Sequence, residues 1–184
     1  MASTPVEVAI IGAGGRGTGF GAILAALPER ARVVAVAEPR DEYREAFARS
    51  HGLPAERVFR DWREIAARPR LADAALVATM DRDHLEPAVA CMRLGYSLFL
   101  EKPMATTLED CETIARVQRE TGAITAVCHS MRYHKAFRML KELVASGRIG
   151  RVVIIDQLEQ VAWWHQAHSF VRGNWGNEAL SSPM

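Results

Sequence analysis

Hydrophobic and polar positions follow one another along residues 6–128 in blocks typical of short buried strands and amphipathic helices. Short apolar runs rich in β-branched residues predict strands that are buried on both faces. The stretches between them have apolar positions at helical spacing, with capping residues before them or glycines after them. The expected strands are 6–11, 31–37, 57–59, 74–78, 97–100 and 124–128, and the expected helices are 18–27, 41–50, 61–67, 83–94 and 107–120. This βαβα alternation predicts an α/β fold, a parallel sheet with helices on both faces.

The apolar spacing also predicts which side of two helices faces the sheet. In the first helix the inward residues are expected to be Ala22, Ile23, Leu24, Ala26 and Leu27. In the second helix they are expected to be Tyr43, Ala46 and Phe47.

The pattern changes after residue 128. A helix is expected over 134–146, and Arg151 to Val161 alternates in the way of a long strand. Residues 162–184 are polar and aromatic and are expected to form a loop. A strand at this place indicates the start of a second sheet. We therefore expect a first domain over 1–130 and an incomplete second domain over 131–184, with the junction near Cys128 to Arg132.

Composition excludes several classes of protein. A length of 184 residues suffices for one domain and part of another, and 49% hydrophobic with 24% charged residues is ordinary for a globular protein. The net charge of +1 gives no reason to expect nucleic acid or an anionic membrane as a partner. No apolar run approaches the ~20 residues of a membrane span, and the N-terminus lacks the basic region of a secretory signal. The three scattered cysteines indicate reduced packing residues in a cytoplasmic protein.

The first strand runs into a glycine-rich segment with the spacing G-x-G-x-x-G. Its glycines are Gly12, Gly14 and Gly17, and Gly15 and Arg16 lie between them. In a dinucleotide site the first glycine allows a tight turn, the second lets the backbone approach a pyrophosphate, and the third lets helix and strand pack closely. The helix N-terminus then supplies free N–H groups for the phosphates. Strand before and helix after favour this interpretation over a glycine-rich loop without a ligand.

The second strand ends at Glu38, 21 positions after Gly17. An acidic residue at this place can accept both hydroxyls of the adenosine ribose, which favours NAD. Arg40 and Arg16 leave NADP open, since an arginine nearby can accommodate a 2′-phosphate. The alternative is that Glu38 only precedes the helix that starts at Asp41.

Glu101-Lys102-Pro103 follows the strand 97–100, at the sheet edge where open α/β folds bind ligands. A lysine there can donate hydrogen bonds to a substrate oxygen, and Glu101 is a candidate orienting partner. The alternative is a surface turn, because proline often ends a strand.

Taken together, these segments resemble the Gfo/Idh/MocA oxidoreductases. The resemblance rests on Gly12 to Gly17, Glu38-Pro39, Thr79-x-Asp81-x-x-His84, Glu101-Lys102-Pro103, Met131-Arg132-Tyr133 and Gly147-Arg-Ile-Gly150. It implies an NAD(P)-binding, doubly wound Rossmann domain followed by the start of an α+β domain on an antiparallel sheet. It implies that Thr79, Asp81, His84 and Glu101 join the cofactor site and that Lys102 contacts the reacting oxygen. It also favours a cis Lys102–Pro103 peptide bond, against a base rate of about 5–6%.

The segment from Trp163 to Trp175 looks like part of one branch of this family. We expect Arg132, His165, His168, Arg172 and Trp175 to contact a sugar or polyol substrate. Donors suit hydroxyl groups, and flat aromatic faces suit C–H groups. The alternative is a loop whose aromatic side chains only fill space. No carboxylate or cysteine cluster completes a metal site around the two histidines, so no metal is expected.

The resemblance implies hydride transfer between a nicotinamide cofactor and a hydroxyl of a sugar or cyclitol. In that family a histidine and an aspartate that serve proton transfer lie in a helix beyond the point where this chain stops. We therefore expect a fragment that binds cofactor with impaired catalysis and that self-associates, or is disordered, beyond about Val161. Homo-oligomers would form through the C-terminal sheet. The alternatives are a cofactor-binding remnant without catalysis and an NAD-dependent glycosidase.

Overall fold

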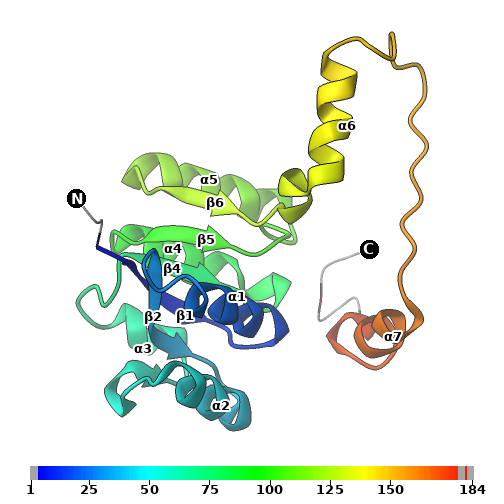
Figure 1. Ribbon diagram of the computed structural model, residues 1–184. Coiled ribbons are helices and arrows are strands. Elements are labelled where there is room, and N and C mark those ends of the chain that lie inside the picture. The colour runs from blue at the N-terminus through cyan, green and yellow to red at the C-terminus, as the bar shows by residue number, and fades with distance from the viewer. Residues whose placement is uncertain (1–3, 178–180, 182–184) are drawn as a thin grey trace. The chain divides into compact units, whose positions relative to one another are not determined.

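The chain builds a six-stranded parallel sheet in its first 128 residues (Figure 1). The computed structural model describes residues 4–177 and 181. The strand order is β3-β2-β1-β4-β5-β6, so the direction of winding reverses between β1 and β4. This is the doubly wound Rossmann order, and the predicted fold class is confirmed. The strands are β1 (Val6–Ile11), β2 (Ala31–Ala37), β3 (Val58–Phe59), β4 (Ala74–Val77), β5 (Ser97–Leu100) and β6 (Thr125–Val127). The helices are α1 (Gly15–Ala25), α2 (Asp41–His51), α3 (Trp62–Ala66), α4 (Leu85–Arg93) and α5 (Leu108–Thr121).

Both faces of the sheet are covered, which explains the continuous apolar runs in its strands. Side chains of a strand alternate between the two faces. In β1, Val8 and Ile10 belong to the cluster that contains Phe47 of α2. Ala9 and Ile11 belong to the cluster on the opposite face, which is covered by α3, α4 and α5.

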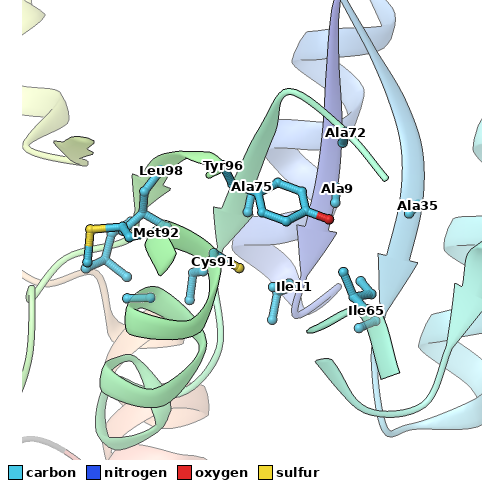
Figure 2. Close-up of a cluster of buried hydrophobic side chains, with 14 of the residues drawn as sticks. Ala9, Ile11, Ala35, Ile65, Ala72, Ala75, Cys91, Met92, Tyr96 and Leu98 are labelled. Atoms are coloured by element: carbon cyan, nitrogen blue, oxygen red, sulfur yellow. The ribbon is translucent and has the colours of Figure 1, made fainter. Parts of the chain in front are cut away.

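Tyr96, just before β5, is the largest fully buried side chain of the larger core cluster. Figure 2 shows its ring lying across the strands that carry Ala9 and Ala75. The ring is 1% exposed, and its hydroxyl accepts a hydrogen bond from the backbone N–H of Leu71 at 2.9 Å. Burial of this large side chain is therefore achieved without an unsatisfied polar atom, as stable burial of tyrosine requires.

Helix α1 differs from its predicted form in its start and in its inward face. It begins at Gly15 instead of Thr18, so its first turn lies inside the glycine-rich segment. The residues that face inward are Gly17, Phe20 and Leu24 toward the sheet and Gly21 toward α2. The other predicted residues are exposed: Ala22, Ile23, Ala26 and Leu27. The prediction failed because glycine contributes no hydrophobicity, yet it is what lets a helix lie close against a strand.

The inward face of α2 was also predicted incorrectly in part. Phe47 is buried as expected, but Tyr43 and Ala46 are exposed. Arg44 occupies the position one turn before Phe47 and is buried instead. A charged side chain can take this place because backbone carbonyls and Asp41 satisfy its donors.

The chain divides into two compact units between Cys128 and His129, inside the predicted junction. The second unit contains α6 (Lys135–Ala145) and α7 (Trp163–His165), and α6 lies within the range predicted for it. Its identification as part of a substrate domain remains a proposal. No helix in the described residues combines the length and apolar composition of a membrane span.

Two predictions for the second unit are wrong. Residues 152–161 form neither strand nor helix, and all of them are exposed. An alternating sequence becomes a strand only when neighbouring strands accept its hydrogen bonds, and the sheet described here takes no strand from this unit. The stretch that was expected to be a loop instead forms α7, a π-helical turn over Gln166–Val171 and a 3₁₀ turn over Asn174–Gly176.

Candidate functional site

The residues that follow five strands lie in one row along the carboxyl edge of the sheet. Each donates its backbone N–H to the carbonyl that ends the neighbouring strand. The pairs are Glu38 to Phe59 at 3.0 Å, Gly12 to Ala37 at 2.8 Å, Ala78 to Ile11 at 2.8 Å, Glu101 to Val77 at 2.9 Å and Cys128 to Leu100 at 2.8 Å. The glycine loop, Glu38 and the lysine turn are thus held together by backbone hydrogen bonds.

Close packing requires glycine at the two ends of the loop. Gly12 has φ +89°, and a Cβ built there would lie 2.6 Å from the carbonyl oxygen of Ala78. A Cβ on Gly17 would lie 1.9 Å from the carbonyl oxygen of Gly12. These contacts fix a tight turn between β1 and α1 and press the helix against the strand.

The middle of the loop is open instead. A Cβ on Gly15 would meet no atom within 4 Å, and a Cβ on Gly14 would meet only Nη2 of Arg40, at 3.3 Å. The first N–H groups of α1, which have no partner inside the helix, follow directly. An open glycine backbone at a helix N-terminus fits a diphosphate, the central part of NAD.

The Glu38 carboxylate is buried, with 2% of the residue exposed. Its Oε2 accepts hydrogen bonds from the backbone N–H of Ala13 at 2.8 Å and from Nη2 of Arg40 at 3.1 Å. Its Oε1 accepts from the backbone N–H of Arg40 at 3.1 Å and from Nε of Arg40 at 2.7 Å. Burial alone would raise the pKa of Glu38, but the hydrogen bonds from Arg40 and Ala13 outweigh it and lower this pKa below its usual value.

Arg40 therefore covers the carboxylate that was expected to receive the ribose. Its guanidinium group stacks on the ring of Tyr43 at 3.9 Å from the ring centroid, and its side chain is half exposed. Arg44 also stabilises the backbone at Glu38, because its Nη1 donates to the Glu38 carbonyl oxygen at 2.8 Å. Sequence reasoning missed Arg44; its spacing of three from Asp41, which it pairs at 2.5 Å, was the available signal.

A cleft of about 580 Å³ opens outside the ends of β1, β2 and β4. The residues that line it include Gly12, Pro39, Trp62, Thr79 and Arg82. This is where the strand order reverses, the place at which open α/β sheets bind their ligands. The cleft reaches the glycine loop at Gly12, the residue of its tight turn, two positions before the open Gly14.

The lysine turn is held on both sides of Lys102. Oε2 of Glu101 accepts a hydrogen bond from the Lys102 backbone N–H at 2.6 Å, and Nδ1 of His84 lies 2.8 Å from the carbonyl oxygen of Pro103. The Lys102–Pro103 peptide bond is cis, so this prediction is confirmed. The other Glu101 oxygen, Oε1, accepts a hydrogen bond from Nε of Arg16 at 2.6 Å.

The other residues expected around the cofactor have different positions in this site. Thr79 lies in the cleft and donates its hydroxyl to the carbonyl of Asp83 at 3.0 Å. Asp81, His84 and Glu101 are buried. His84 and Glu101 hold the lysine turn through the bonds described above. Direct contact of any of the three with a cofactor remains a prediction.

The residues expected to bind substrate belong to the second unit. His165 contacts the Trp164 and Phe170 rings, with centroids 5.5 Å and 5.6 Å away, and Phe170 contacts Trp175 at 6.5 Å. The helical turns thus bring the aromatic part of this segment together. Arg132, His168 and Arg172 are exposed. Among the residues that the structure describes, no group of three or more His, Cys, Asp or Glu is placed to hold a metal ion.

This chain is similar to several known enzymes in sequence and to solved dehydrogenase structures in fold. The 2,7-anhydro-N-acetylneuraminate hydratase of Mediterraneibacter gnavus is 32% identical over 80% of this chain, which spans 38% of that protein. Inositol 2-dehydrogenase 2 of Saccharopolyspora erythraea is 33% identical over 52% of this chain, which spans 28% of it. Among solved structures, myo-inositol 2-dehydrogenase of Lactobacillus plantarum matches 81% of this chain and 43% of its own with a TM-score of 0.74 at 23% identity, which shows the fold.

A family model connects the sequence and the site. Residues 6–129, which contain the glycine loop, Glu38 and the lysine turn, match the model described as oxidoreductase family, NAD-binding Rossmann fold. The chain therefore belongs to the Gfo/Idh/MocA family of oxidoreductases, with an NAD-binding Rossmann domain over these residues.

Proposed function

We propose that this chain binds NAD along the carboxyl edge of its sheet. We further propose that the protein transfers hydride between the nicotinamide and a hydroxyl group of a sugar or cyclitol. The observation that carries this proposal is the row of residues that joins the open glycine loop to the Lys102 turn through adjacent strands. Bound NAD would supply the hydride acceptor, and the protein would supply positioning and polarisation.

The roles of the residues follow from their places in this row. The backbone of Gly14, Gly15 and Arg16 would hold the diphosphate at the start of α1. Lys102 would donate a hydrogen bond to the substrate oxygen, or take its proton, because it is the cation on the turn after β5. Arg132 and the segment with His165, His168, Arg172 and Trp175 would contact the sugar or polyol.

The preference for NAD over NADP would rest on Glu38, whose carboxylate repels a 2′-phosphate. A carboxylate has about four lone-pair sites, and Ala13 and Arg40 already fill them. Ribose hydroxyls can therefore reach Glu38 only after the Arg40 side chain moves away. NADP is the alternative, with Arg40 remaining in place and facing the 2′-phosphate.

A second candidate reaction is non-oxidative overall. The relative from Mediterraneibacter gnavus that covers 80% of this chain is named a hydratase. Addition or removal of water at a sugar, including NAD-dependent glycoside hydrolysis, is therefore the runner-up. A panel of aryl glycosides separates it from net oxidation, since hydrolysis releases the aryl group without net change in NADH absorbance.

The test of the first proposal combines cofactor titration with a panel of inositols and sugars, followed by NADH absorbance. The unsubstituted chain should bind NADH, and Lys102→Met should bind it within about threefold. The turnover that the unsubstituted chain retains should fall in Lys102→Met by about 10²–10⁴-fold, the usual contribution of positioned proton transfer. Turnover that survives Lys102→Met unchanged would refute the role of the lysine. Low turnover by this chain alone and its self-association stay predictions, measured in the same assay and by light scattering.

A further inference from the structure

Arg16 reaches from the glycine loop to the opposite half of the sheet edge. It lies in the first turn of α1, and its Nε and Nη2 are 2.6 Å and 2.5 Å from Oε1 of Glu101, 85 positions later in the chain. Nη2 also lies 3.7 Å from Sγ of Cys128, and the guanidinium packs on the Phe20 ring at 4.9 Å. The Arg16 side chain is 60% exposed, and these three contacts lie on its buried part.

Glu101, the partner of Arg16, is also bonded to the lysine turn. Its side chain is 5% exposed, and its second oxygen accepts the Lys102 backbone N–H at 2.6 Å. One carboxylate therefore joins two segments, with the arginine of the glycine loop on Oε1 and the lysine backbone on Oε2. Both bonds involve a charged group, which makes them stronger than bonds between neutral partners.

The geometry makes the place of Lys102 depend on Arg16. A buried carboxylate that loses its cationic partner is strongly unfavourable. Without Arg16, the Glu101 side chain would turn toward water, and this movement weakens its bond to the Lys102 N–H. The backbone bond of Glu101 itself, from its N–H to Val77, involves no atom of Arg16.

We propose that Arg16 is a positioning residue that fixes the Lys102 turn through Glu101, and so ties this turn to the cofactor loop. This inference rests on the proposed role of Lys102 at the substrate oxygen. The position of the Lys102 turn then depends on the glycine loop, because the Arg16 guanidinium lies between the two. The loop is the segment proposed to bind the diphosphate, and the turn is the segment proposed to contact the substrate.

The test is amide hydrogen exchange measured residue by residue by NMR on the full 184-residue chain. In Arg16→Gln the Lys102 amide should exchange at least tenfold faster than in the unsubstituted chain. The Glu101 amide, one residue earlier, should change less than twofold. Arg16→Lys should restore part of the protection, because a lysine keeps the charge but lacks the planar fork. Arg116→Gln removes an arginine–glutamate pair of 2.7 Å on α5 and should leave both amides unchanged.

Two results would overturn the inference. The first is unchanged protection of the Lys102 amide in Arg16→Gln. The second is equal acceleration of the Glu101 and Lys102 amides, which would mean that Arg16 only stabilises the domain. NADH titration of the same samples keeps the proposed function separate: if the unsubstituted chain fails to bind NADH, the cofactor proposal fails, whereas the exchange rates still decide the role of Arg16.

Discussion

The contact between α1 and β1 gives a sharp test of why this fold needs its glycines. In Gly17→Ala the new Cβ would lie 1.9 Å from the carbonyl oxygen of Gly12, although Cβ atoms essentially never approach another atom closer than 3.0 Å. The obstacle is backbone, and its neighbours are fixed by the bond from Gly12 N–H to Ala37 and from Thr18 N–H to Gly14. Relief therefore requires the helix to move by about an ångström.

The cost can be set against a matched control on the same helix. Overpacking of this kind costs about 3 kcal/mol, the upper end of the usual range, because no flexible side chain can yield. The gain from replacing glycine by alanine in a helix is about 1 kcal/mol, so Gly17→Ala should lose about 2 kcal/mol net. Gly19→Ala meets no atom within 4 Å and should gain about 1 kcal/mol.

The difference of about 3 kcal/mol corresponds to more than a hundredfold in the folding equilibrium. Guanidinium unfolding followed by far-ultraviolet circular dichroism measures it, with equal slopes required for the comparison. A Gly17→Ala midpoint at or above that of the unsubstituted chain would refute the packing argument.

Three further predictions concern the edge of the sheet and the second unit. Folding lowers the pKa of Glu38, so its contribution to the free energy of unfolding is complete above the unfolded pKa of about 4.3 and is lost as the pH falls through the folded pKa. Glu38→Gln should therefore be less stable than the unsubstituted chain at neutral pH and should lose less stability on acidification. Equal slopes of stability against pH for the two proteins would contradict this. Arg40→Ala should weaken NADP binding at least tenfold while NAD binding holds or improves, and unchanged NADP affinity would remove Arg40 from the ribose site. Limited proteolysis should first cut the exposed residues 152–161 and then trim residues 129–150, which leaves a stable core that ends near Cys128. Protection of residues 152–161 would contradict this prediction.

The first domain could be predicted from the sequence because each of its signals is local. A buried parallel strand carries its own apolar run, and a helix end carries its own glycine, as Gly52 and Gly122 do in the left-handed conformation. The order of the motifs then placed Gly12, Glu38 and Lys102 at one edge, since parallel strands end on the same side. Nothing nonlocal was needed for this step.

Two kinds of feature could not be predicted. One is a pairing between residues far apart in the chain, such as Arg16 and Glu101. The other is the conformation of a single side chain, since the sequence places Arg40 near the ribose but does not show that it lies on Glu38. Arg44 was missed because hydrophobic spacing disregards a buried charge. The strand expected over 151–161 was predicted from its local alternation alone. A strand also needs neighbouring strands as hydrogen-bonding partners, and these lie elsewhere in the sequence.

The most direct test of the central claim is an NADH titration of the unsubstituted chain beside Gly14→Val. Gly14 has an extended backbone, with φ −68° and ψ −166°, and its Cβ would meet only the movable end of Arg40. The variant should therefore stay folded, although valine is a poorer N-cap than glycine and lowers the denaturant midpoint somewhat. Its side chain crowds the part of the loop where we propose that the diphosphate binds. We expect NADH fluorescence to report binding to the unsubstituted chain and at least a tenfold weaker affinity for Gly14→Val. Equal affinity of the two folded proteins would show that the cofactor does not bind at the glycine loop.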